Sequence, residues 1–385
     1  MLLVEARRRT WLWQDMLDSI VPRPSNKKPA DVPAPAPAQV AKRVSLKTLA
    51  EYLDLSPATI SLVLNNSPVA NSIPPTTRQR VVAAAKKFNY RPNPLARSLR
   101  MNRTHTVGII APEHSEGYFT GLMMAIETYL IQAGYLYFTV SHLGQRDLLE
   151  EYPRLLVNRQ VDGVLLINTQ LPEALPIPTV AISSHSTHSN VIDVSLDHEV
   201  AATLTLRHLY DLGHRRIAFM HGQTNSLDSQ PRWDATMRAA KALGLVVDPK
   251  LCISLEHNSW SPDLGYQPVL ELLRHTQDFT ALVCFNDQAA IGAIRAVADC
   301  GLRCPVDLSI VGFDDISGAG FSIPRLTTVR QPLQQMGETA ARTLIAAIEG
   351  TAPAERELCF APELIHREST AAPTRLMKTP ARKAR

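Results

Sequence analysis

The stretch that decides the fold of this chain runs from residue 45 to residue 65 and reads SLKTLAEYLDLSPATISLVLN. Four of its apolar residues recur with the spacing of one helix face, namely Leu46, Leu49, Ala50 and Leu53. Ser45 precedes them as an N-cap. Ser56 followed by Pro57 is a second helix start, because serine caps the first turn and proline loses no needed N–H there. The stretch therefore predicts two short helices joined by a tight turn.

A third helix is predicted soon after the second. It starts at Pro74-Pro75 and runs to about Asn89, with an inward face of Val81, Ala84, Ala85 and Phe88. In the second helix the inward residues are Ile60, Val63 and Leu64. Three short helices, of which the first two are joined by a tight turn, are typical of a helix-turn-helix domain.

The charge of the chain is divided unevenly. Residues 42–105 carry eleven Lys or Arg and two acidic residues, a net charge of +9, whereas residues 106–370 sum to −12. A basic segment of this size is typical of a domain that binds a polyanion. A solvated charged face is the alternative, and charge alone does not exclude it.

After residue 104 the pattern changes to short β-rich runs that alternate with helical stretches. The predicted strands are 106–111, 135–140, 163–167, 179–182, 216–220, 281–285 and 308–312. The predicted helices include 117–133, 200–212, 232–243, 287–299 and 333–349. This alternation indicates parallel sheets with right-handed crossovers, and the number of strands favours two doubly wound α/β subdomains.

The two ends and the cysteines limit the remaining possibilities. Residues 1–43 are predicted to be a disordered extension with a Pro/Ala-rich linker, and residues 371–385 a disordered basic tail. No run of eighteen apolar residues and no signal-peptide pattern occurs, which predicts no membrane span.

Five scattered cysteines favour a reducing, cytoplasmic location. Cys300 and Cys304 are close, but no second pair completes a zinc site, so no metal or cofactor is expected.

Several motifs taken together resemble the LacI/GalR family of bacterial transcription regulators. Besides the two capped helices, they are YRPNPLARSLR at 90–100, GFDD at 312–315 and LTTV at 326–329. The resemblance covers about residues 44–370. It implies a helix-turn-helix DNA-binding domain over 44–92 and a hinge helix over 93–103. It also implies a periplasmic-binding-protein-like core over 104–370 that binds an effector and dimerises.

The resemblance assigns the helix over 57–64 to the major groove of operator DNA. The residues expected at the DNA are Ser45, Lys47, Ser56, Pro57, Ala58, Thr59, Ser61, Leu62 and Asn65, with Ser56, Ser61 and Asn65 on phosphates. Many family members carry an arginine where Leu62 stands. Leu62 cannot make the arginine–guanine contact but could pack on a thymine methyl group, so the operator sequence does not follow.

The hinge segment is short and apolar, and its predicted DNA contacts are Leu95, Ala96, Leu99 and Arg100. A lone two-turn helix is marginal in water. In the family this segment folds on the operator and wedges a leucine into the minor groove, and Leu99 matches that leucine. The alternative is a connecting linker with an incidental leucine.

The resemblance also places an effector in the crevice between the two subdomains, at the carboxyl ends of the strands. The residues predicted to bind the effector are His114, Tyr118, Phe119, Asp197, Arg232, Trp260, Asp287 and Phe313. Tyr118 and Phe119 would form a wall, Arg232 would hold an oxygen-rich group, and Asp287 would accept hydrogen bonds from hydroxyls. The alternatives are a helix cap for Asp287 and a core position for Trp260.

The sequence contains no catalytic constellation. The prediction is a ligand-responsive transcription regulator, favoured to be a repressor, that binds a near-palindromic operator as a homodimer and responds to a small, polar, sugar-like effector. A purine or a phosphosugar is the alternative effector. One alternative is a sugar-binding or sugar-processing protein on the same α/β fold, and another is a DNA-binding protein without sensing. Within the core, the chain is expected to cross between the two subdomains near Leu196, near Leu326 and near residue 355.

Overall fold

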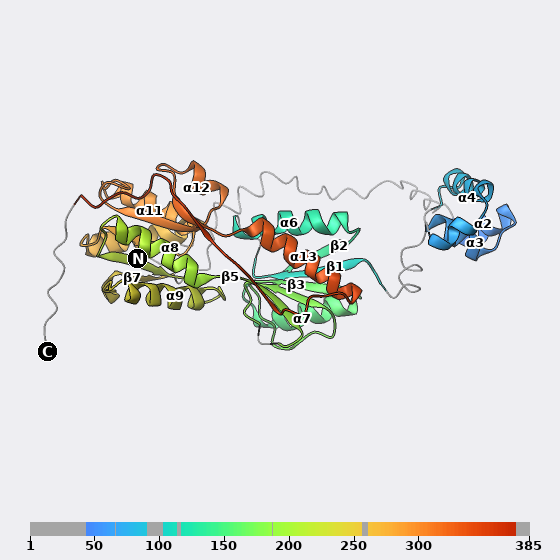
Figure 1. The fold of residues 1–385 in the computed structure, drawn as a ribbon, viewed down its shortest axis with the longest axis horizontal. Coiled ribbons are helices and arrows are strands. Elements are labelled where there is room, and N and C mark those ends of the chain that lie inside the picture. Colours follow the sequence, from blue (N-terminus) through green and yellow to red (C-terminus); the bar gives the residue numbers. More distant parts are fainter. Residues whose placement is uncertain are drawn as a thin grey trace, which may run out of the picture. The chain divides into compact units, whose positions relative to one another are not determined.

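The structure, a computed structural model, describes residues 44–65, 67–90, 103–113, 117–186, 188–255 and 261–374. These residues form two separate units. A helical unit lies within residues 1–92 and an α/β unit within residues 93–385 (Figure 1). We call them the headpiece and the core.

The described residues of the headpiece form three α-helices and one 3-10 turn: α2 (Leu46–Leu53), α3 (Pro57–Leu64), η1 (Pro68–Ser72) and α4 (Pro75–Lys87). Both predicted caps are present. The Oγ of Ser45 accepts a hydrogen bond from Thr48 N at 3.1 Å, and the Oγ of Ser56 accepts one from Thr59 N at 3.1 Å. The helix starts that the sequence predicted are therefore confirmed, whereas η1 was not predicted.

The three α-helices of the headpiece enclose a small apolar core. Leu49 of α2, Ile60 of α3 and Val81 of α4 are fully buried at its centre. The other positions predicted to face inward are buried or half-buried around them. Burial on this scale is enough to hold three short helices that would be marginal alone.

The core contains two six-stranded sheets. The first has the order β11-β5-β4-β3-β1-β2, and all its strands are parallel. Its strands are β1 (Thr106–Ala111), β2 (Leu136–Ser141), β3 (Gly163–Ile167), β4 (Thr179–Ile182), β5 (Val191–Leu196) and β11 (Glu357–Phe360). We call the part built on this sheet the N-terminal subdomain.

The second sheet has the order β12-β10-β9-β8-β6-β7 and is parallel except for β12. Its strands are β6 (Ile217–His221), β7 (Cys252–Ser254), β8 (Ala281–Val283), β9 (Ser309–Asp314), β10 (Thr327–Arg330) and β12 (Glu363–Ile365). We call the part built on it the C-terminal subdomain. The two doubly wound subdomains predicted from the sequence are thus confirmed.

Helices cover both faces of each sheet (Figure 1). The N-terminal subdomain has α6 (Tyr118–Gln132), α7 (Arg146–Asn158) and α13 (Leu333–Glu349). The C-terminal subdomain has α8 (His198–Asp211), α9 (Ser229–Ala242), η2 (Pro249–Leu251), α10 (Asp263–His275), α11 (Asp287–Asp299) and α12 (Ser317–Phe321). The sequence did not predict α7 and α10, each of which contains a proline that weakens the helical signal, Pro153 and Pro268. No helix in the described part of the chain is long and apolar enough to cross a membrane.

The chain passes between the subdomains three times, as predicted, but two of the crossings come later than expected. The first lies between β5 and α8, near Leu196. The second follows Arg330, because β10 still pairs with β9 up to that residue. The third follows Phe360, because β11 pairs with β5 up to that residue. The predictions of crossings near Leu326 and residue 355 are therefore displaced by a few residues.

Helices α10 and α11 approach each other so closely that only glycine fits at two positions. A Cβ atom on Gly292 would lie 1.8 Å from the Pro262 carbonyl oxygen, and one on Gly265 would lie 1.9 Å from the Ala289 carbonyl oxygen. In both cases the opposing atom belongs to the backbone, which cannot swing away as a side chain can. The packing of this helix pair therefore depends on the two glycines.

We expect Gly292→Ala to lower the free energy of unfolding of the core by about 2 kcal/mol or more, since the added methyl group forces the two helices apart. Urea unfolding followed by circular dichroism measures this change. The control is Gly320→Ala, where no heavy atom lies within 4 Å of the added Cβ. Equal effects of the two substitutions would show that the close approach carries no stability.

Candidate functional site

The first candidate site is the amino-terminal half of α3 with the residues before it. Pro57 and Ala58 are exposed, and Thr59 and Leu62 are half-buried, on the helix whose Ile60 is fully buried. Ser45, Lys47, Ser56 and Asn65 are exposed as well. The headpiece therefore presents most of the residues predicted to contact DNA to its surroundings.

Ser61 is the exception on this helix. Its side chain is buried, and Asn65 Nδ2 donates hydrogen bonds to Ser61 Oγ at 3.1 Å and to Ser61 O at 2.8 Å. Ser61 is thus covered by its own helix in the free chain, and its phosphate contact stays a prediction. The four hinge positions Leu95, Ala96, Leu99 and Arg100 lie outside the described residues.

The second candidate site is a pocket between the two subdomains of the core. Its lining includes Tyr118, Asn168, Ser226, Asp228, Arg232, Asn286, Asp314 and Gln331. Most of these residues end a strand or follow one: Tyr118 comes after β1, Asn168 after β3, Asp228 after β6 and Gln331 after β10. The carboxyl ends of both parallel sheets thus open onto one space, which is where ligands bind in open α/β folds.

Arg232 of α9 is held in this pocket by stacking. Its guanidinium carbon lies 3.6 Å from the ring centroid of Phe313 and 4.6 Å from that of Phe285. Its NH1 donates to the Phe285 carbonyl oxygen at 2.7 Å. Its buried Nε has no hydrogen-bond partner among the described residues. The planar group is therefore fixed in direction, and one of its buried donors is unpaired.

Asp314 ends strand β9 and lies on the same pocket. Its Oδ1 accepts a hydrogen bond from Gln331 Nε2 at 2.6 Å, and its backbone has a φ of 111°. A non-glycine residue in that region is strained, which is typical of functional positions. Desolvation raises the pKa of Asp314 to about 6, against the opposing effects of Arg232 and Gln331. The GFDD motif contains this residue, but nothing in the sequence distinguished it as a residue that binds the effector.

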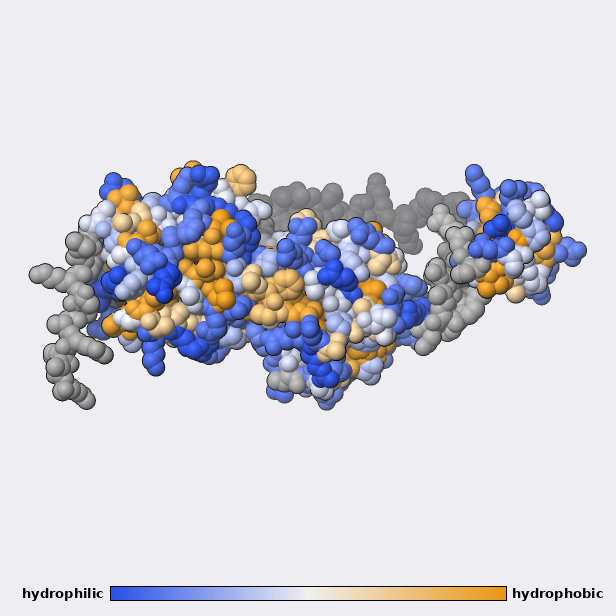
Figure 2. All heavy atoms as spheres, viewed as in Figure 1, coloured by the Kyte–Doolittle hydropathy of each residue, from blue (hydrophilic) through white to orange (hydrophobic). Residues whose placement is uncertain are grey.

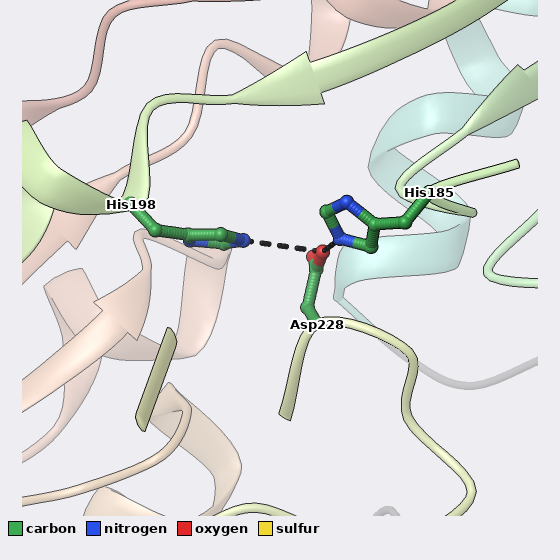
Figure 3. Close-up of side chains that lie close together, drawn as sticks. All are labelled: His185, His198 and Asp228. Carbon is green, nitrogen blue, oxygen red and sulfur yellow. Dashed lines mark hydrogen bonds and ion pairs between the residues drawn. The ribbon is translucent and has the colours of Figure 1, made fainter. Parts of the chain in front are cut away.

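Asp228 is the third polar centre of the pocket and was also missed. His185 Nε2 lies 2.7 Å and His198 Nε2 3.2 Å from Asp228 Oδ1 (Figure 3). Arg232 NH2 lies 3.6 Å from Asp228 Oδ2. Desolvation alone would raise the pKa of Asp228, but the hydrogen bonds from the histidines and the charge of Arg232 outweigh it and hold the pKa well below its usual range. Asp228 is therefore a buried carboxylate whose charged form is favoured by its neighbours.

Two hydrogen bonds in the described residues join the subdomains directly across this pocket. His185 follows β4 of the N-terminal subdomain, whereas Asp228 precedes α9 of the C-terminal subdomain. Asn168, which follows β3, accepts a hydrogen bond on Oδ1 from Leu227 N at 2.8 Å. The loop before α9 is thus tied to the opposite sheet.

Asp287 does not have the ligand-binding role that was predicted for it. It is fully buried, its Oδ1 accepts from Thr328 Oγ1 at 2.5 Å, and its Oδ2 accepts from Ile316 N at 2.9 Å. The cap of α11 is Asn286, which accepts from Ala289 N at 2.9 Å. The alternative role as a cap is therefore wrong too, because Asp287 instead connects α11 to β10 and to the segment after β9.

Burial corrects one further prediction, and another of the predicted residues is a helix cap. Phe119 packs in the apolar core beneath α6 and is 7% exposed, so it does not form a wall of the pocket. Asp197 caps α8 by accepting from Val200 N at 2.9 Å. Tyr118 does line the pocket and donates to Ser183 Oγ at 3.0 Å. His114 and Trp260 lie outside the described residues.

Comparison with known families gives two matches along the chain. Residues 45–93 match the model for "Bacterial regulatory proteins, lacI family", and residues 206–370 match that for a "Periplasmic binding protein-like domain". The HTH-type transcriptional repressor PurR of Haemophilus influenzae is 30% identical over 339 residues, which cover 84% of this chain and 98% of that protein. PurR of Erwinia tasmaniensis is 30% identical over 336 residues, with coverages of 85% and 97%.

Solved structures show the same similarity. The lac repressor dimer bound to operator and the anti-inducer ONPF superposes with a TM-score of 0.75 at 25% identity, covering 86% of this chain and 100% of that one. The complex of the transcriptional regulator CelR with cellobiose superposes with a TM-score of 0.63 at 27% identity, covering 85% and 100%. The likeness therefore extends over the headpiece and the core together.

As the pH rises, the core of the Asp314→Asn variant should gain stability relative to the core of the parent protein. Between pH 3.8 and about 6 the folded chain keeps a proton on Asp314 that the unfolded chain has lost, so this group's contribution to stability falls with pH. Relative to the parent, the variant should gain about 3 kcal/mol across that window. Urea unfolding at several pH values measures the difference. The same substitution at the exposed Asp147 is the control, and parallel profiles for both variants would contradict the burial of an ionisable Asp314.

Proposed function

Because the chain belongs to the LacI family of bacterial regulatory proteins, we propose that it is a cytoplasmic, ligand-responsive transcription repressor that binds a near-palindromic operator as a homodimer. The observation that carries this proposal is the union, in one chain, of a capped helix-turn-helix headpiece with a polar cleft between two α/β subdomains. We assign residues 44–92 to DNA binding, 93–103 to the hinge and 104–370 to effector binding and dimerisation. Residues 1–43 and 371–385 flank these parts.

The headpiece reads DNA through α3. An α-helix fits the major groove, and the exposed Pro57, Ala58 and the half-buried Leu62 offer apolar contacts there. Apolar side chains suit thymine methyl groups, so base recognition by this helix favours thymine contacts over guanine contacts. The net charge of +9 over residues 42–105 supplies the attraction to phosphates. Leu99 of the hinge wedges into the minor groove at the centre of the site.

Two exposed apolar areas of the core support a homodimer. On α6 and the edge strand β2 the exposed residues are Met124, Ile131, Leu136 and Phe138, between 51% and 74% exposed. At the end of α12, Phe321 is 88% and Ile323 91% exposed. Figure 2 shows apolar side chains gathered in patches on an otherwise largely hydrophilic core. Exposed apolar groups of this kind mark association surfaces, and a solved relative is a dimer on its operator.

The cleft holds a small polar effector. Asp314, Gln331 and Arg232 place acceptors and a fixed donor around one space, and buried groups of this kind need ligand partners when water is excluded. Hydroxyl groups can both donate to Asp314 and accept from Arg232, which favours a sugar-like molecule. One structural relative holds cellobiose and another the anti-inducer ONPF. The relatives matched by sequence are repressors, and we assign the cleft binding without catalysis.

The mechanism is a shift between open and closed clefts. A ligand that contacts both subdomains stabilises the closed form by its differential affinity, and the change in subdomain position alters the spacing of the paired hinges. The alternative, a sugar-binding or sugar-processing protein that regulates no gene, leaves the headpiece without a role. A gel-shift assay with genomic fragments distinguishes the two, because only a regulator retains a specific fragment.

Operator binding should weaken steeply as salt rises, because several Lys and Arg side chains per protomer replace counterions on the phosphates.

Leu99→Ala should lose about tenfold or more in affinity for the retained operator while binding random DNA as before, because it removes only the wedge. Fluorescence anisotropy with both DNAs measures this. A flat salt dependence, or equal losses on operator and random DNA, would contradict the proposal.

Arg232→Ala should still bind operator but no longer respond to the effector found by screening a metabolite panel. The loss of a charge-assisted hydrogen bond in a buried site weakens ligand binding by about 1.5–3 kcal/mol, since the ligand's polar group is left without its partner. Effector titration by calorimetry and operator anisotropy measure the two properties. The control is Arg238→Ala, on the exposed face of the same helix, where the arginine pairs with Glu199. Equal effector affinity in both variants would remove Arg232 from the binding site.

A further inference from the structure

Three side chains in the cleft converge in a way that the proposed function does not use. The Nε2 atoms of His185 and His198 approach the same oxygen of Asp228, and the three potential ligand atoms all lie within 4.8 Å of one another (Figure 3). The residues come from three separate segments: His185 follows β4, His198 begins α8, and Asp228 precedes α9. Because they lie far apart in the sequence, no local motif signals them.

We infer that His185, His198 and Asp228 form a binding site for a divalent transition-metal ion that joins the two subdomains. Two imidazole nitrogens and one carboxylate oxygen are a common ligand set for zinc, cobalt and nickel. Tetrahedral zinc bonds of about 2.0–2.1 Å place neighbouring ligand atoms about 3.3 Å apart. The distances from Asp228 Oδ1 to His185 Nε2 and His198 Nε2, 2.7 and 3.2 Å, are near that value. A fourth ligand would come from water or from a molecule in the cleft.

The charge around the three side chains favours a cation. When the histidines are neutral, the described carboxylates that act on this cluster are those of Asp193, Asp228, Asp314 and Glu357, and the guanidinium that opposes them is that of Arg232. Arg232 approaches the Oδ2 of Asp228 and leaves Oδ1 to the histidines. A divalent ion at Oδ1 would replace the protons that His185 and His198 now donate there, and it would balance the excess of carboxylates.

The ion would act on the cleft, because its ligands lie on both sides of it. His185 belongs to the N-terminal subdomain, whereas His198 and Asp228 belong to the C-terminal subdomain. Opening the cleft would separate His185 from the other two ligands and break the site. Metal binding therefore stabilises the closed form, and the chain would sense a metal ion alongside its effector.

The test titrates Co²⁺ into the full-length protein after dialysis against a chelator and follows the visible d–d absorption. We expect one Co²⁺ per chain, displaced by Zn²⁺. Each of His185→Gln, His198→Gln and Asp228→Asn should weaken binding at least about tenfold, because each removes a ligand atom and leaves the other two in place. Circular dichroism shows whether each variant is folded, and three independent variants keep the test valid if one is not.

The matched control is His208→Gln. His208 is a half-buried histidine of the C-terminal subdomain that packs on His366, with ring centroids 4.6 Å apart, and its Nε2 lies 2.9 Å from Thr370 Oγ1. Co²⁺ binding should be unchanged in this variant. Equal losses in His208→Gln and His185→Gln would overturn the site.

Three other outcomes would overturn the proposal: no Co²⁺ bound, binding unaffected by the three cleft variants, or a near-ultraviolet thiolate charge-transfer band that places the ion on cysteine. In each case the cluster would serve only as a hydrogen-bonded latch between the subdomains. The titration needs no DNA, so a chain that binds Co²⁺ in the cleft but retains no operator fragment would overturn the proposed function and leave the metal site standing.

Discussion

The buried charge of Asp228 is the constraint on which the geometry of the cleft depends. A carboxylate taken out of water must be compensated by donors or cations, or it destabilises the fold by several kcal/mol. Its compensating groups come from both subdomains: His198 and Arg232 from its own, and His185 from the other. Opening the cleft therefore withdraws one partner but leaves two. The open form keeps most of the compensation, so the free-energy gap between open and closed forms can be small enough for a ligand to reverse.

The start of the core is attached to one subdomain only, and this gives closure a route to the hinge. Thr104 N donates to Asp162 Oδ1 at 2.8 Å, and Arg103 NH2 donates to the Ile348 carbonyl oxygen at 2.9 Å. Asp162 precedes β3 and Ile348 lies in α13, both in the N-terminal subdomain. Any rotation of that subdomain against its partner therefore carries residue 103 with it, and the segment before residue 103 is the one assigned to the hinge.

The sequence predicts a feature when the residues that indicate it lie close together along the chain. The starts of α2 and α3 were predictable because a serine cap and a helical apolar face lie within a few residues of each other. The alternation of strands and helices predicted two doubly wound subdomains for the same reason. The cluster of His185, His198 and Asp228 was not predictable, because three loops at the carboxyl ends of different strands bring it together. The burial of Ser61 was not predictable either, because the apolar face of α3 is wide enough to include it, which a polar side chain does not reveal.

The exchange of roles between Asp287 and Asp314 shows why residue type alone cannot identify a ligand. Both are buried carboxylates at the same sheet edge, but both oxygens of Asp287 already accept hydrogen bonds, from Thr328 and from Ile316 N. Those bonds fix β10 and the segment after β9, which flank Asp314 and its partner Gln331. Because both oxygens of Asp287 accept hydrogen bonds inside the fold, this carboxylate positions its neighbour. Asp314 keeps capacity to accept hydrogen bonds and can face the ligand. The residue that the sequence favoured thus supports the one that it passed over.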